Sequence, residues 1–68
     1  MSYRIEVERE TDGRWVAEVP GLPGCLAYGD TKDHALAGAK ALALRVLADR
    51  LEHGETDPNL GSVTFKAA

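Results

Sequence analysis

The chain has 68 residues, of which 44% are hydrophobic and 28% are charged. A chain of this length forms one small domain, and its composition is that of a folded globular protein rather than a disordered or fibrous one. We therefore expect a single domain over residues 1–68. Its one cysteine, Cys25, leaves no intramolecular disulfide, which favours the reducing cytoplasm as the location.

The net charge of −3 argues against the broad basic surface with which proteins displace counterions from nucleic acids, so we expect no direct DNA binding. No apolar run approaches the roughly 18 residues of a membrane span, and we expect no membrane association. The carboxylates are concentrated in the first half of the chain, where three arginines accompany Glu6, Glu8, Glu10, Asp12, Glu18 and Asp30. An acidic half of this kind suits a basic partner.

Three strands are predicted in the first half. Residues 3–8 alternate apolar and polar, which places Tyr3, Ile5 and Val7 on a buried face. The turn at residues 11–13 contains Asp-Gly, typical of a hairpin, so a second strand over residues 14–19 returns antiparallel to the first. Two prolines and two glycines make residues 20–24 an irregular connection. A short third strand over residues 26–28 then pairs antiparallel with the second.

A long helix is predicted from Lys32 to about His53, because this segment is rich in Ala and Leu. Thr31 is a favourable N-cap, and Asp33 in the first turn faces the positive end of the helix dipole. Gly54 is a typical C-terminal stop. The predicted apolar face consists of residues at helical spacing, namely Leu36, Ala39, Leu42, Ala43, Val46, Leu47 and Leu51.

Ala35 and Leu44 widen this apolar face to roughly half of the helix circumference, more than one sheet requires. Two interpretations stay open: the helix contacts a second surface, or loops of the domain cover the surplus. Because the core is small and neither a disulfide nor a metal stabilises it, we predict a homo-oligomer, most simply a dimer.

A final strand over residues 62–66 completes the order β-β-β-α-β. This order predicts the α+β class, with a four-stranded mixed sheet and one long helix packed on one face. Trp15 and Phe65 are expected in or beside the core, because large aromatic side chains dominate burial in a small domain.

The residues offer no catalytic, cofactor or metal site. Cys25 follows a Pro-Gly corner and is interpreted as a buried structural residue, with only His34 and His53 as candidate bases. A structural zinc site needs four Cys or His ligands, and the chain has three such residues in total. No glycine-rich loop has phosphate-binding spacing ahead of the helix. We therefore expect no enzymatic activity and no cofactor.

A resemblance to a known family rests on residues 15–36, which read WVAEVPGLPGCLAYGDTKDHAL. The pattern aromatic-Val-Ala-x-Val-Pro, then Leu-Pro-Gly-Cys, then Gly-Asp-Thr before an Ala-Leu helix closely resembles the central motif of the HicB-like antitoxin family. The resemblance implies a partial ribonuclease-H-like fold and, as partner, a HicA-type toxin that cleaves messenger RNA. The apolar face of the helix and the last strand lack the metal-binding carboxylates of such nucleases, so the fold is expected without catalysis.

Many members of that family add a C-terminal DNA-binding segment, which residues 1–68 do not contain. The resemblance thus predicts a single-domain member without a DNA-binding tail, acting as a non-catalytic antitoxin that covers the active surface of its toxin. The alternative is an orphan regulator that binds RNA or a small ligand without a toxin partner. Candidate partner-binding residues are the outward carboxylates Glu6, Glu8, Glu18 and Asp30, although solubility alone would also explain each of them.

Overall fold

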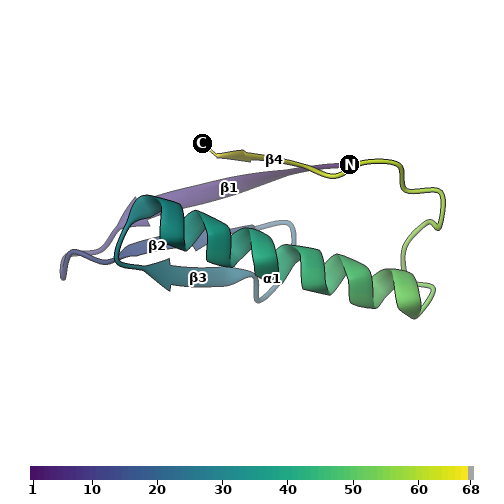
Figure 1. The fold of residues 1–68 in the computed structure, drawn as a ribbon, viewed down its shortest axis with the longest axis horizontal. Coiled ribbons are helices and arrows are strands. Elements are labelled where there is room, and N and C mark those ends of the chain that lie inside the picture. The colour runs from purple at the N-terminus through teal and green to yellow at the C-terminus, as the bar shows by residue number, and fades with distance from the viewer. Residues whose placement is uncertain (68) are drawn as a thin grey trace.

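The computed structural model describes residues 1–67 and shows a sheet crossed on one face by a helix (Figure 1). Its elements are β1 (Ser2–Arg9), β2 (Trp15–Glu18), β3 (Leu26–Gly29), α1 (Lys32–Glu52) and β4 (Thr64–Ala67). The observed order β-β-β-α-β confirms the predicted α+β class. Across residues 1–67, no helix combines the length and apolarity that crossing a bilayer requires.

The four strands form one mixed sheet in the order β3-β2-β1-β4. β1 pairs antiparallel with β2, and β2 pairs antiparallel with β3, as the two short connections predict. β4 instead lies parallel to β1 because the chain returns across the sheet through α1 (Figure 1). The first and last strands are consequently neighbours, joined at their start by the Thr64 N–H, which donates to the Met1 carbonyl at 2.9 Å.

The hairpin between β1 and β2 has the predicted turn. Gly13 adopts a φ of 91°, which the Asp-Gly sequence permits. The carboxylate of Asp12 accepts hydrogen bonds from the backbone N–H and the Nε of Arg14, at 3.0 and 2.9 Å. The backbone hydrogen bond is the main cause that lowers the pKa of Asp12 below its ordinary value, and the Arg14 guanidinium adds to it.

The core lies between the sheet and the inner side of α1. Ile5 of β1 and Ala17 of β2 are fully buried, and Tyr3 and Val7 pack beside them as predicted. From α1 the buried residues recur every fourth position, namely Ala35, Ala39, Ala43 and Leu47. Small side chains bring the helix close to β3: a Cβ on Gly38 would lie 2.9 Å from the Cβ of Ala27.

The prediction that Leu51 belongs to the core-facing side of the helix is wrong, because its side chain is 41% exposed. A 21-residue helix is about 31 Å long, whereas a four-residue strand spans about 13 Å. The last turns of α1 therefore extend past β2 and β3 (Figure 1). Ala35, expected from the sequence only to widen the apolar face, is instead fully buried.

The Pro-Gly connection between β2 and β3 closes one end of the core. Val19, Leu22 and Cys25 are almost fully buried. Hydrogen bonds between their backbones, from Leu22 N–H to the Val19 carbonyl and from Val19 N–H to the Cys25 carbonyl, measure 3.0 and 2.9 Å. Cys25 is thus a structural residue in this connection, as interpreted from the sequence.

The ends of α1 lie where the capping residues predict. The Thr31 hydroxyl accepts the His34 N–H at 3.1 Å, and Gly54 follows the helix with a left-handed φ of 71°. Trp15 and Phe65 are partly buried against the core, as expected. The ring of Phe65 stacks on Tyr3 with 6.1 Å between centroids.

Candidate protein-binding surface

The side of the sheet away from α1 is open. Since side chains alternate along a strand, the residues between the buried positions of β1, β2 and β3 all point to this open side. The strand register arranges them in two rows. Glu6 lies opposite Glu18, which lies opposite Leu26; in the next row Glu8 lies opposite Val16, which lies opposite Tyr28.

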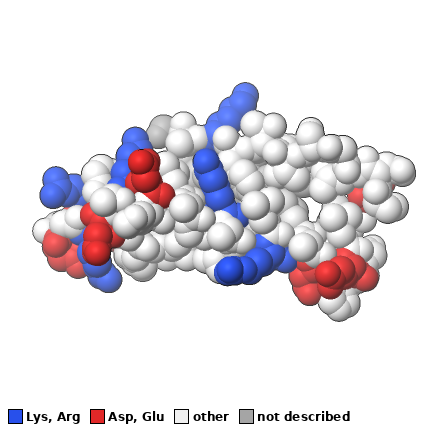
Figure 2. All heavy atoms as spheres, viewed as in Figure 1, with Lys and Arg blue, Asp and Glu red and all other residues white. Residues whose placement is uncertain are grey.

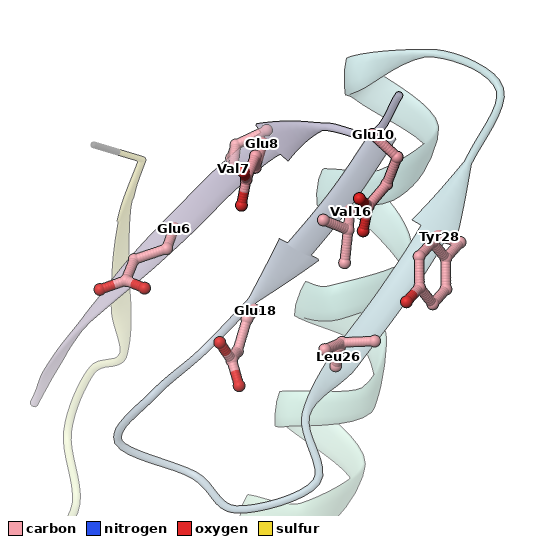
Figure 3. Close-up of a pocket in the computed structure, with 8 residues that line it drawn as sticks. All are labelled: Glu6, Val7, Glu8, Glu10, Val16, Glu18, Leu26 and Tyr28. Atoms are coloured by element: carbon pink, nitrogen blue, oxygen red, sulfur yellow. The ribbon is translucent and has the colours of Figure 1, made fainter. Parts of the chain in front are cut away.

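These rows enclose an open cavity of about 390 Å³. Figure 3 shows its lining residues, which come from β1, β2, β3 and the first residue after β1: Glu6, Val7, Glu8, Glu10, Val16, Glu18, Leu26 and Tyr28. We call Glu6, Glu8, Glu10, Val16, Glu18, Leu26 and Tyr28 the acidic sheet face. Its glutamates lie on β1, on β2 and directly after β1, and its most exposed apolar side chains lie beside them on the edge strand β3, with Leu26 40% and Tyr28 50% exposed. Accessible aromatic and apolar side chains next to charged ones are typical of a protein interface.

The electrostatics of the acidic sheet face are unfavourable in the isolated domain. Glu6 and Glu18 occupy directly opposite positions of an antiparallel pair, an arrangement in which like charges destabilise the sheet. Arg4 offsets part of this repulsion through an exposed salt bridge to Glu6 at 2.9 Å. Within residues 1–67, no salt bridge engages Glu8, Glu10 or Glu18. The face therefore presents carboxylates that are available to an external cation.

A second cation beside the face is already engaged. The guanidinium of Arg14 lies 4.8 Å from the centroid of the Tyr28 ring, within range of a cation–π interaction. The Nε of the same guanidinium donates to Asp12 at 2.9 Å. Arg14 thus contacts both Asp12 and the Tyr28 ring at the hairpin end of the face.

Three of the four candidate binding residues from the sequence meet on this face: Glu6, Glu8 and Glu18. The fourth, Asp30, lies between β3 and α1 and is not among the residues that line the cavity. Sequence reasoning missed the contributions of Glu10, Val16, Leu26 and Tyr28. A signal was present, because Val16 precedes Glu18 by two residues, and period-two alternation puts both on one side of a strand.

A separate cluster lies at the end of α1, where ligand atoms of Asp49, His53 and Glu55 come within 4.8 Å of one another. All three side chains are exposed, and His53 Nδ1 lies 2.8 Å from the Asp49 carbonyl oxygen and 3.3 Å from its carboxylate. Contacts of this kind stabilise the last turn of a helix. Without buried groups to orient the ligands, the cluster has the character of a helix end rather than a metal centre.

The fold is thus that of a small α+β domain with one open, acidic sheet face. The chain is 34% identical over 69 residues to the UPF0150 protein Ta0767 of Thermoplasma acidophilum, and the alignment covers 98% of the chain and 100% of that protein. The chain therefore belongs to the UPF0150 family.

A second relative is encoded by a virus. The chain is 38% identical over 58 residues to a 14.9 kDa protein from the rep-hol intergenic region of Haemophilus phage HP1. That alignment covers 85% of the chain but 43% of the phage protein. No family model and no solved structure matches the chain.

Proposed function

We propose that this protein is a non-catalytic, HicB-like antitoxin module that binds a small HicA-type toxin and covers its RNA-cleaving surface. The observation that carries the proposal is the acidic sheet face, in which four glutamates lie beside the accessible apolar side chains of Leu26 and Tyr28. The partner class comes from the motif resemblance of residues 15–36. The alignment spans all of the UPF0150 protein Ta0767, so a chain of this length occurs as a protein of its own in that relative.

The chemistry of an RNA-cleaving partner explains the choice of residues. A surface that binds RNA presents Lys and Arg to the phosphates. Carboxylates at Glu6, Glu8 and Glu18 compete for the same cations, and complementary charge accelerates association and selects the partner. Leu26 and Tyr28 add accessible apolar side chains that a bound protein would shield from water, and shielded aromatic side chains commonly make the strongest interface contacts.

The opposed pair Glu6 and Glu18 argues for a role beyond solubility. Charges that only maintain solubility need not be placed directly opposite one another, where they weaken the sheet. A cation from the partner would relieve this repulsion on binding. Relief of the repulsion between Glu6 and Glu18 would then add to the free energy of binding.

The direct test is the triple variant Glu6→Gln, Glu8→Gln, Glu18→Gln, mixed with a HicA-type protein encoded beside the gene. We expect an intact fold, association slower by about tenfold or more at low salt, and a weaker salt dependence. The matched control removes three acids in the last turn of α1 and just after it, with Asp49→Asn, Glu52→Gln and Glu55→Gln. This control variant should keep the fast association of the unaltered protein. Unchanged rate, salt sensitivity and RNA protection in the first variant would place the docking surface elsewhere.

A second variant separates charge from apolar contact. Tyr28→Ala removes the largest exposed side chain of the cavity and should act mainly on the dissociation rate, because short-range packing is lost only after docking. A loss of about 30-fold in affinity corresponds to a central interface residue. If no toxin gene adjoins this one and the protein itself retains short RNA oligonucleotides, the orphan regulator becomes the better description.

A further inference from the structure

The outer side of α1, away from the sheet, carries an apolar stripe. Its members are Ala37, Ala41, Leu44, Ala48 and Leu51, which we call the outer stripe. They are spaced alternately by four and three residues, the spacing at which two helices pack along a common seam. Leu44 is 51% exposed and Leu51 41%, so the largest side chains of the stripe remain accessible in the domain.

The leucines and alanines of the stripe are spaced so that two copies of the stripe fit each other. If two copies of α1 run antiparallel about a two-fold axis near Val46, Leu44 of each copy lies level with Ala48 of the other. In the same arrangement Leu51 lies level with Ala41 of the second copy. Each leucine thus meets an alanine, and small residues at such a seam allow the helix axes to approach within about 8 Å.

The charges beside the stripe favour the same antiparallel orientation. Arg45 lies on one flank, and Asp49 and Glu52 follow on that flank toward the end of the helix. Figure 2 looks onto α1 from outside and shows Lys and Arg over the middle of this side, with Asp and Glu gathered where the helix ends. A two-fold axis brings identical flanks together, so Arg45 of each copy would lie beside the acidic end of the other; parallel packing would align like charges.

We propose that the outer stripe is the interface of a homodimer in which two α1 helices pack antiparallel. The occupant is a second copy because the surface is complementary to itself in both size and charge. The small core supports this assignment, since four of the nine buried residues in the described part of the chain are alanines, namely Ala17, Ala35, Ala39 and Ala43. Domains with so small a core commonly gain stability by association.

This arrangement has a consequence for the acidic sheet face. Because α1 and the acidic sheet face lie on opposite sides of the sheet, the dimer would turn its two acidic faces outward. Each copy then keeps a complete surface for a partner, and the dimer binds two partner molecules. The interface itself is independent of the proposed antitoxin function.

Sedimentation equilibrium of the full chain at tens of micromolar tests the proposal. The unaltered protein should have twice the mass of one chain, and Leu44→Glu should raise the dissociation constant of the dimer about 30-fold or more, because it buries a charge at the centre of the seam. The matched control is Leu26→Glu, which places the same charge at a comparably exposed leucine on the acidic sheet face and should leave the dimer intact. Circular dichroism and the unfolding midpoint establish that both variants fold.

A charge exchange tests the orientation. Arg45→Glu alone should weaken the dimer, and the combination Arg45→Glu, Asp49→Arg, Glu52→Arg should restore it. A protein that sediments as a single chain overturns the proposal, as does a dimer that survives Leu44→Glu but dissociates with Leu26→Glu. Failure of the triple charge exchange to restore association overturns the antiparallel arrangement.

Discussion

The acidic sheet face and the outer stripe of α1 both carry exposed apolar side chains, and they differ in the charges beside those side chains. Four glutamates line the sheet cavity together with Leu26 and Tyr28, so two copies placed face to face would bring eight carboxylates together. The outer stripe is bordered instead by charges of both signs, separated along the helix. The comparison teaches that exposed apolar area alone does not identify a partner, whereas the charge around it does.

The same substitution on the two sides of α1 should have its largest effect on the inner side. Ala39→Leu adds bulk at a fully buried position and should lower the free energy of unfolding by about 1–3 kcal/mol. Ala48→Leu adds the same bulk on the outer stripe and should change the unfolding of the single domain by less than about 0.5 kcal/mol. Urea unfolding, at a protein concentration low enough to dissociate dimers, measures the free energy of unfolding of both variants. Equal losses would mean that the outer stripe is packed within the domain.

The N-cap residue Thr31 sets where α1 begins. Thr31→Ala removes the acceptor of the His34 N–H and should cost about 1 kcal/mol, or several degrees in melting temperature. Thr31→Ser keeps the hydroxyl and should retain most of the stability. An unchanged midpoint in the alanine variant would show that the helix is held by packing of its inner side alone.

The acidic sheet face should gain stability when its repulsion is removed. Glu18→Gln eliminates the like charge opposite Glu6 and should raise the free energy of unfolding by about 0.2–1 kcal/mol, with the gain shrinking as salt screens the charges. Glu8→Gln, opposite the uncharged Val16, is the matched control and should gain less. If the two variants behave alike, the opposed pair carries no special penalty.

The smallest effect is expected at the hairpin turn, which belongs to neither surface. Hydrogen bonding from the Arg14 backbone lowers the pKa of Asp12, so its carboxylate stabilises the fold fully above the ordinary pKa of an aspartate. That contribution declines as the pH falls through the lowered pKa. The difference in melting temperature between the unaltered protein and Asp12→Asn should therefore narrow in acid. A difference that is constant from neutral to acid pH would contradict this role of the carboxylate.

Local signals in the sequence determined the elements and most of their ends. Alternation predicted β1, the Asp-Gly turn predicted the hairpin, and Thr31 and Gly54 bounded the helix, because each acts on neighbouring backbone groups. The final strand was less well placed, predicted over residues 62–66 and found at Thr64–Ala67. Its bounds depend on pairing with β1, which is distant in the sequence.

Three of the four candidate binding residues could be found from strand alternation, which places Glu6, Glu8 and Glu18 on an outward face. Tertiary structure alone decided that Glu6 faces Glu18, that Leu26 and Tyr28 complete the cavity, and that Asp30 lies outside its lining. It also decided that Leu51 extends past the short strands. The physical reason is that alternation and capping depend on residues a few positions apart, whereas register and helix overhang depend on how segments far apart in the chain align.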